Sequence, residues 1–101
     1  MKNFRTYMLA IEVYSQSQKL VLPSHLKKQF DRAASSVALN LAEGYGRRTD
    51  ADRKHFFTIA FGSTRECQCI CALVGKNATD ICAKFDSLAA HIYRLLHPKG
   101  G

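Results

Sequence analysis

The sequence has no tryptophan and only two prolines, Pro23 and Pro98, among its 101 residues. Proline breaks a helix from within, so the long stretch between these two positions is open to helices. No apolar run approaches the roughly 18–20 residues of a membrane span, since the longest covers only residues 69–74. Glu12 interrupts the short apolar segment 8–11, which argues against a secretory signal. We therefore expect a soluble cytoplasmic protein with no membrane partner.

The composition and charge are those of a small basic globular protein. Hydrophobic residues make up 47% and charged residues 23% of the chain, which excludes an intrinsically disordered composition. The length suits one domain spanning residues 1–101. The 15 Lys and Arg exceed the 8 Asp and Glu and give a formal net charge of +7. This balance favours anionic partners such as nucleic acid, anionic lipid or an acidic protein, without choosing among them.

Apolar residues recur at helical spacing, and the residues that stop them separate the first two expected helices. The first helix is expected over Asn3–Val21, with Pro23 ending it. The second follows Ser24, a candidate N-cap, and ends at Gly44 and Gly46, whose backbone freedom suits a helix end.

Two further helices follow by the same criteria. Thr49 is expected to cap the third helix, with two aspartates in its first turn and Gly75 as its stop. Asn77 is expected to cap the fourth, which ends before Pro98. The inner stripes of the last three helices are predicted to hold Leu26, Phe30, Ala33, Val37, Asn40 and Gly44 in the second, Phe56, Phe57, Ala60, Thr64, Cys67, Ile70, Cys71 and Val74 in the third, and Ile81, Cys82, Phe85, Leu88, Ala89, Ile92, Leu95 and Leu96 in the fourth. The short connections predict an all-α fold, an antiparallel four-helix bundle.

The first helix has two apolar faces, which indicates that another subunit covers one of them. Its inner stripe is predicted to hold Phe4, Tyr7, Met8, Ile11, Tyr14 and Gln18. The stripe on its back, together with single apolar residues on the second and third helices, predicts an oligomer interface formed by Leu9, Val13, Leu20, Leu39 and Phe61. The alternative is that a neighbouring helix or loop of the same chain covers these residues.

Polar residues also fall on or beside the expected inner faces of the second and third helices. They are Asn40, Glu43, Arg53, Ser63 and Glu66. An unpaired buried polar group costs about 1–3 kcal/mol, so such residues need partners. The favoured interpretation is a structural polar network that fixes the register of the two helices. A ligand or catalytic site built from the two carboxylates is the alternative.

Two segments carry a family resemblance. Residues 40–47 read Asn-Leu-Ala-Glu-Gly-Tyr-Gly-Arg, and residues 59–63 read Ile-Ala-Phe-Gly-Ser, with Phe57 before the second segment and Glu66 after it. Residues 32–37, Arg-Ala-Ala-Ser-Ser-Val, provide a matching lead-in. Over most of its length the chain resembles the bacterial four-helix-bundle proteins of the 23S rRNA intervening-sequence type.

The resemblance implies a fold, an assembly and a class of partner. Some members of the family are encoded within intervening sequences of large-subunit rRNA genes. A related bundle is the accessory variability protein of diversity-generating retroelements, a basic ring of five subunits that binds a reverse transcriptase and nucleic acid. No catalytic activity is associated with this fold. The resemblance therefore implies a homo-oligomer, a pentameric ring, with nucleic acid and a reverse transcriptase as partners.

The cysteine-rich run of residues 67–71 departs from the family pattern. On a helix, Cys67 and Cys71 share one face, whereas Cys69 points about 200° away from Cys67. One helix therefore cannot offer all three thiols to one metal ion, although Cys82 could approach from the fourth helix. We expect reduced core thiols with no metal and no cofactor. A metal or redox protein is the third-ranked function.

Enzyme signatures are weaker still. The histidines His25, His55, His91 and His97 fall near helix ends or on polar faces, and none has a nucleophile and an orienting acid beside it. Residues 44–46, Gly-Tyr-Gly, lack the Lys-Ser/Thr of a phosphate-binding loop. We expect a protein that is not an enzyme.

Basic residues are the remaining functional candidates. They fall on the outer side of the second helix and around the turn into the third, namely Lys27, Lys28, Arg32, Arg47, Arg48, Arg53 and Lys54. Solvated charge that keeps a small bundle soluble is the alternative for each residue. A symmetric ring would repeat the patch into a large basic surface that binds phosphates with little sequence preference. The sequence thus favours a non-enzymatic nucleic-acid-associated accessory protein that assists a reverse transcriptase, over a structural or protein-binding oligomer with no nucleic-acid role.

Overall fold

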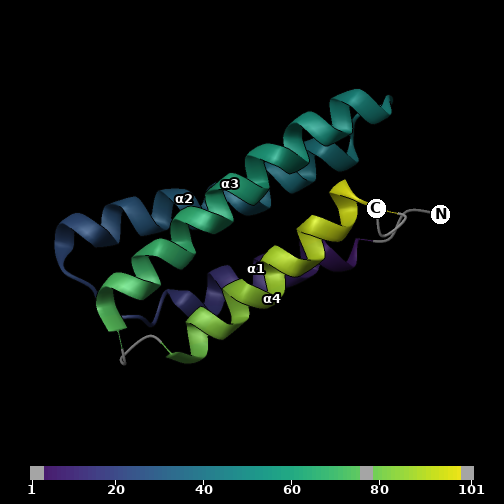
Figure 1. Cartoon of the computed structure of the whole chain (residues 1–101). Helices are drawn as coiled ribbons and strands as arrows, with labels where there is room; N and C mark the ends of the chain where they lie inside the picture. Colours follow the sequence, from purple (N-terminus) through teal and green to yellow (C-terminus); the bar gives the residue numbers. More distant parts are fainter. Residues whose placement is uncertain (1–3, 76–78, 99–101) are drawn as a thin grey trace.

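The computed structural model describes residues 4–75 and 79–98, which form four helices and no strand. The helices are α1 (Arg5–Ser17), α2 (Ser24–Tyr45), α3 (Asp50–Val74) and α4 (Thr79–Leu96). Each of α2 and α4 packs against both α1 and α3, and α2 and α3 share the most extensive interface. Figure 1 shows the long α2 and α3 lying side by side, with the shorter α1 and α4 along one side of them. The fold is all-α, as the sequence predicts.

The first helix is shorter than predicted. It ends at Ser17 rather than Val21, and the amides of Gln18 and Lys19 bond back three residues in a tighter turn. The side chain of Ser17 donates a hydrogen bond of 2.8 Å to the carbonyl oxygen of Tyr14. Proline disfavours helical geometry in the residue before it, so the chain stays irregular up to Pro23.

Helix termini confirm one of the predicted N-caps and contradict another. The side chain of Thr49 accepts a hydrogen bond of 3.1 Å from the amide of Asp52, so Thr49 caps α3. Ser24 is instead the first residue of α2, with Pro23 at the N-cap position and no capping side chain. Asn77, predicted to cap α4, lies outside the described residues.

Only some of the glycines end a helix in the way that the sequence predicts. Gly75 ends α3 with φ 73°, the left-handed geometry that glycine adopts without strain. Gly44 lies inside α2 and is buried, and Gly46 follows that helix with φ −83°. The end of α2 therefore does not use the backbone freedom of glycine, and Gly44 needs another explanation.

Three of the four helices bury the faces that their spacing predicts. The core contains large side chains from α2, α3 and α4, with Phe30 and Phe85 packed edge to face at 5.5 Å. The fully enclosed apolar members of this core include Phe30, Val37, Leu41, Ala60, Cys67, Leu88 and Ile92. Burial of this shared apolar surface stabilises the arrangement of the helices.

The buried face of α1 is rotated from the prediction, although Tyr7 and Tyr14 of the predicted inner stripe do pack against the core. The buried residues of α1 are Thr6, Ala10, Val13 and Ser17. Val13 is 0% exposed and lies in the chain's own core, and Leu9 and Leu20 pack against the same core. Val13 is thus covered within the chain, which contradicts its assignment to an oligomer interface, whereas Leu9 and Leu20 are half-buried and their assignment stays a prediction. Phe4, Met8 and Ile11, predicted to face inward, are exposed instead.

Candidate functional site

Basic side chains gather where α2 passes into α3. Arg47 and Arg48 follow the end of α2, and Arg53 and Lys54 lie in the first turns of α3. The guanidinium of Arg47 forms an ion pair of 2.6 Å with Glu43 and lies 4.7 Å from the ring centroid of Phe56. Arg48 and Lys54 are exposed and make no ion pair with any described residue.

Arg53 has a structural role in this turn. Its guanidinium pairs with the carboxylate of Asp50 and donates a hydrogen bond of 2.7 Å to the backbone carbonyl of Arg47. These contacts join the first turn of α3 to the residues that follow α2. Arg53 therefore holds the turn in place and is the least available of the basic residues at this end.

The other predicted basic residues lie at the far end of α2. Lys27 forms an ion pair of 2.8 Å with Asp31, which also accepts a hydrogen bond from Gln18 beyond the end of α1. Lys28 and Arg32 are exposed. A helix rises 1.5 Å per residue, so Lys28 lies roughly 30 Å from the α2–α3 turn. The predicted basic set is two separate groups in one subunit.

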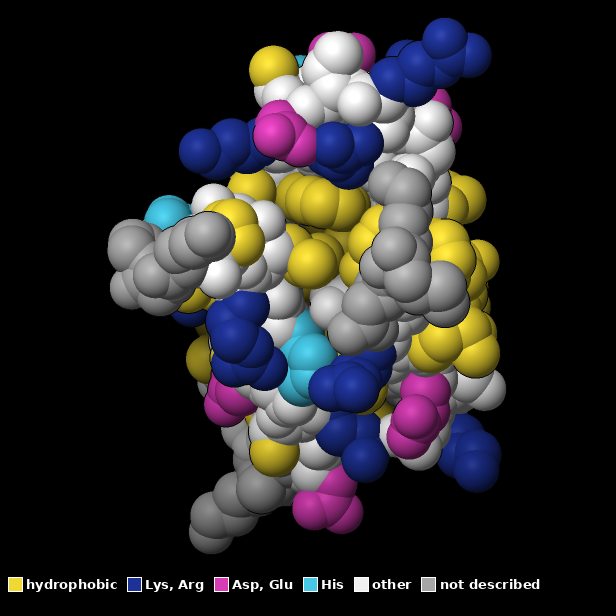
Figure 2. All heavy atoms as spheres, turned by 90° about the vertical axis from the view of Figure 1, so that its right-hand side faces the viewer, with side chains coloured by type: hydrophobic (Ala, Val, Ile, Leu, Met, Phe, Trp, Pro, Cys, Tyr) yellow, Lys and Arg dark blue, Asp and Glu magenta, His cyan; other side chains and the backbone are white. Residues whose placement is uncertain are grey.

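A hollow with an apolar floor lies beside the basic turn. It has a volume of about 240 Å³ and is lined by Asp50, Arg53, Lys54, Phe57, Leu95, Leu96 and Pro98. The end face in Figure 2 shows hydrophobic side chains lying between groups of Lys and Arg side chains. This end of the molecule thus presents positive charge next to apolar surface.

The predicted polar network exists in a smaller form. The side-chain amide of Asn40 donates to the backbone oxygen of Ser36 at 2.9 Å and to its hydroxyl oxygen at 3.0 Å. The hydroxyl of Ser63 donates to that of Ser36 at 2.9 Å, which links α3 to α2.

The other three predicted members of this network lie elsewhere. Glu43 pairs with Arg47, Arg53 pairs with Asp50, and the side chain of Glu66 is exposed. The structure therefore does not bring the two carboxylates of Glu43 and Glu66 into one site with Asn40.

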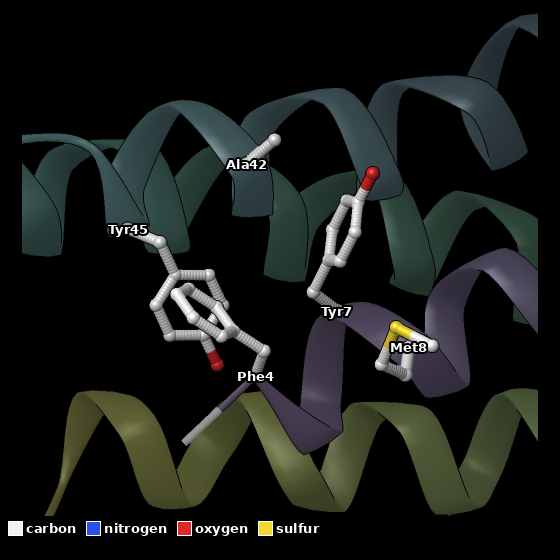
Figure 3. Close-up of a pocket in the computed structure, with 5 residues that line it drawn as sticks. All are labelled: Phe4, Tyr7, Met8, Ala42 and Tyr45. Atoms are coloured by element: carbon white, nitrogen blue, oxygen red, sulfur yellow. The ribbon is translucent and has the colours of Figure 1, made fainter. Parts of the chain in front are cut away.

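An open groove between α1 and α2 is the feature that the sequence analysis missed. Its volume is about 350 Å³, and it is lined by Phe4, Tyr7, Met8, Ala42 and Tyr45. Figure 3 shows Phe4 and Tyr45 at one end of the groove and Tyr7 and Met8 at the other, with Ala42 on the α2 side. The spacing of Phe4, Tyr7 and Met8 along α1 is the signal for this groove in the sequence, but the same spacing predicts a core face.

Tyr45 connects this groove to the core. Its ring packs edge-on against Phe4 at 5.1 Å and against Phe57 at 5.2 Å, so aromatic contacts run from α1 through α2 to α3. Its hydroxyl oxygen is buried and makes no hydrogen bond of normal geometry within the described chain. Burial raises the pKa of the Tyr45 phenol above its usual value, and the nearby Thr6 hydroxyl opposes part of that rise.

The four cysteines are free thiols in different environments. Cys67 and Cys71 are buried, Cys82 is half-buried and Cys69 is exposed. Burial, with a smaller effect of the Glu66 carboxylate, raises the pKa of Cys67 to about 12. Burial followed by a hydrogen bond with Cys82 raises that of Cys71. Among the described residues, no three His, Cys, Asp or Glu side chains gather in a way that could hold a metal ion.

The remaining predicted residues lie at separate places on the surface. Leu39 is 67% exposed on the outer side of α2, and Phe61 is half-buried beside Tyr93 of α4. The four histidines are dispersed, and the ring of His97 stacks on that of Tyr93 at 4.1 Å. No helix within residues 4–75 and 79–98 has the length and apolar character to cross a membrane.

The chain matches a known protein family over nearly its whole length. The family described as 23S rRNA-intervening sequence protein matches residues 4–97, which include all four helices and both motif segments. Comparisons with curated proteins and with solved structures give no match. The chain belongs to the 23S rRNA-intervening sequence protein family.

Proposed function

We propose that this chain is a non-enzymatic accessory protein that self-associates and binds nucleic acid through its basic surface. The observation that carries the proposal is the basic α2–α3 turn, where Arg48 and Lys54 remain exposed after the neighbouring ion pairs are made. Phosphate groups are the expected ligands, since binding by dispersed Lys and Arg side chains needs no base-specific geometry. The formal net charge of +7 supports the same class of partner.

The subunit in this proposal is an antiparallel four-helix bundle. Its support is the pairing of Ser36 with Ser63 and of Gly44 with Phe57, in which later residues of α2 meet earlier residues of α3. The family resemblance supports a pentameric ring, with a reverse transcriptase as a further partner. A ring would repeat the basic turn around its axis and strengthen the field that attracts phosphates.

Self-association would use the outer face of α2 and α3, because Val13 on the back of α1 is covered. Residues 55, 59, 62, 66, 69 and 73 of α3 are all exposed and recur at the 4–3 spacing of a helical seam. Ile59 and Leu73 are apolar members of this set, and Leu39 is an exposed apolar residue of α2. Gly62 in the middle of the set would let a second helix approach closely.

A binding titration tests the nucleic-acid role. The assembled protein should bind random-sequence RNA and DNA at low salt in a fluorescence-anisotropy assay. The double variant Arg48→Gln/Lys54→Gln should weaken binding to all sequences alike, because it removes two phosphate contacts. The matched control Lys19→Gln/Lys84→Gln removes the same charge from positions outside the turn and should weaken binding less.

A second candidate function is a structural or protein-binding oligomer with no nucleic-acid role. The exposed apolar side chains of Leu39, Ile59 and Leu73 favour this alternative, since they suit a protein contact better than a phosphate contact. Absence of nucleic-acid binding by an intact oligomer at low salt would select it over the proposed function.

Light scattering tests the shared assumption of assembly. The wild-type protein should be an oligomer at micromolar concentration, and Leu39→Asp/Ile59→Asp should dissociate it by burying unpaired charges at the contact. Val21→Asp is the matched control, since Val21 is 88% exposed in the connection between α1 and α2. A monomeric wild-type protein would contradict self-association in both candidate functions.

A further inference from the structure

The groove between α1 and α2 has the composition of a stacking site. Three of its five lining residues are aromatic, namely Phe4, Tyr7 and Tyr45, and the other two are Met8 and Ala42. Phe4 is 49% exposed and Met8 is 62% exposed, so their apolar surfaces face solvent. Pockets that bury a flat ligand commonly combine apolar and aromatic walls with polar groups nearby.

The groove also adjoins the basic turn. Tyr45 is the last residue of α2, and Arg47 and Arg48 follow within three positions. Three residues of chain span at most about 11 Å, so positive charge lies close to the aromatic end of the groove. The side chain of Arg48 makes no ion pair with a described residue and is exposed to bind an anion.

We propose that this groove receives an unpaired base of single-stranded nucleic acid, with the neighbouring phosphates held by Arg48 at the α2–α3 turn. The inference rests on the proposed nucleic-acid role and deepens it by naming the form of nucleic acid. A paired base inside a duplex keeps its faces stacked on its neighbours, so it cannot enter the groove. Single-strand binding proteins combine a positively charged track with aromatic side chains, over sites of about 4–16 nucleotides.

Charge and shape together favour this occupant over a purely apolar one. The groove is open to solvent between α1 and α2, and the rings of Phe4 and Tyr45 stand together at one end of it (Figure 3). Arg47 follows Tyr45 by two residues, so the arginines adjoin this end. An apolar segment of another protein would use the groove but gain nothing from the positive charge at that end. A nucleotide contacts both the aromatic groove and the positive charge beside it, because it joins an aromatic base to an anionic phosphate.

The test compares one oligonucleotide as a single strand and as a duplex. The single strand carries 2-aminopurine, whose fluorescence falls when the base stacks. We expect the wild-type protein to quench the single strand and to bind it at least about tenfold more tightly than the duplex at equal salt.

Two variants alter the groove, one on the α1 side and one on the α2 side. Phe4→Ala removes an aromatic wall outside the core, and Ala42→Leu fills the groove from α2 while all three aromatic side chains remain. Each should reduce single-strand affinity about tenfold and abolish quenching, with duplex affinity unchanged. Tyr93→Ala removes a 51% exposed aromatic from α4 and should leave single-strand affinity as it is.

Four outcomes would overturn the inference. Equal affinity for single strand and duplex, or full quenching by both groove variants, would leave the nucleic-acid role standing while removing the base site. Dissociation of the oligomer by Phe4→Ala would assign the groove to a contact between copies. Absence of binding to either form by the wild-type protein would overturn the proposed function as well.

Discussion

A β-carbon on Gly44 would lie 2.6 Å from Cε1 of Phe57 and 3.3 Å from the backbone oxygen of Arg53. The first distance is closer than real β-carbons approach a ring, so α2 and α3 can pack as they do only because residue 44 has no side chain. Phe57 is itself held by its edge-on contact with Tyr45. The conformation of Gly44 is helical, and its requirement is for space.

Gly44→Ala should therefore destabilise the protein although alanine favours helices. The forced shift of Phe57 outweighs the gain in helix propensity, and we expect a net loss of about 1–2 kcal/mol in the free energy of unfolding. Gly62→Ala is the control, since nothing lies within 4 Å of the added carbon. Both glycine variants are made in the Leu39→Asp/Ile59→Asp background, which we expect to be monomeric, and there Gly62→Ala should raise stability by about 1 kcal/mol in urea unfolding. Equal effects of the two variants would contradict this account of the α2–α3 contact.

Tyr45→Phe should leave the fold intact and raise its stability by about 1 kcal/mol, because it removes a buried hydroxyl that has no hydrogen-bond partner of normal geometry in the described chain. The ring contacts with Phe4 and Phe57 would persist. Thermal unfolding followed by circular dichroism measures the change. A clear loss of stability would show that the hydroxyl has a partner in solution, such as bound water.

Ser36→Ala should lower the free energy of unfolding by about 1 kcal/mol, because Ser36 joins Asn40 to Ser63 across the two helices. Ser35→Ala is the matched control. The hydroxyl of Ser35 bonds only to the carbonyl oxygen of Arg32 within the same helix, so its loss should change stability by less than about 0.5 kcal/mol. Chemical denaturation of both variants distinguishes a network between helices from a local contact.

The buried thiols predict a loss of stability in alkali. Burial raises the pKa of Cys67 to about 12, whereas an unfolded thiol ionises near pH 8.5–9. Above that pH the unfolded chain releases a proton that the folded chain keeps, so the stability present below about pH 9 is lost as pH rises toward 12. Because of this thiol, the free energy of unfolding should fall by about 1.4 kcal/mol for each pH unit in this range. Cys67→Ala should make the free energy of unfolding fall less steeply with rising pH. An unchanged decline in this variant would contradict the prediction.

Thiol labelling should follow exposure in the same way. Cys69 is exposed in the single chain but belongs to the proposed contact face of α3. It should therefore react with iodoacetamide first in the variant Leu39→Asp/Ile59→Asp, which we expect to be monomeric, whereas the buried Cys67 and Cys71 should react only on unfolding. Mass spectrometry after brief labelling identifies the modified residue. Rapid labelling of Cys67 would show that α3 separates from the core in solution.

The core faces of the third and fourth helices could be predicted from the sequence because apolar residues recur at helical spacing along each. Thr49 caps α3 and Gly75 ends it, as predicted. The buried residues Phe85, Leu88 and Ile92 occupy the predicted stripe of α4. In these two helices the periodicity of the sequence agrees with the observed packing, so periodicity alone predicts which face is buried.

The orientation of α1 could not be predicted because two stripes compete. Residues 4, 8 and 11 and residues 6, 10, 13 and 17 recur with the same spacing, and side-chain hydrophobicity favours the first stripe. The structure buries the second, in which Ala10 lets the helix approach its neighbours and Ser17 satisfies its hydroxyl on its own backbone. Packing shape decided between two stripes that periodicity could not rank.

The basic residues show a second limit of sequence reasoning. Seven positions close in sequence predicted one patch, but α2 separates Lys28 from Arg48 by most of its length. Ion pairing then distinguishes residues of equal charge, since Arg53 holds the turn while Lys54 makes no ion pair with a described residue. The sequence supplies the charge, and only the structure shows which side chains remain available.

The salt dependence of binding tests the central claim most directly. If the assembled protein makes about 6–10 phosphate contacts, its affinity for random single-stranded RNA should fall by a few hundredfold to roughly 10⁴-fold between about 50 and 200 mM salt. Arg48→Gln/Lys54→Gln should make the slope of log affinity against log salt shallower by about 1.4 for each subunit that contacts the strand. An oligomer that binds no nucleic acid at 50 mM salt, or a slope that this variant leaves unchanged, would contradict the account.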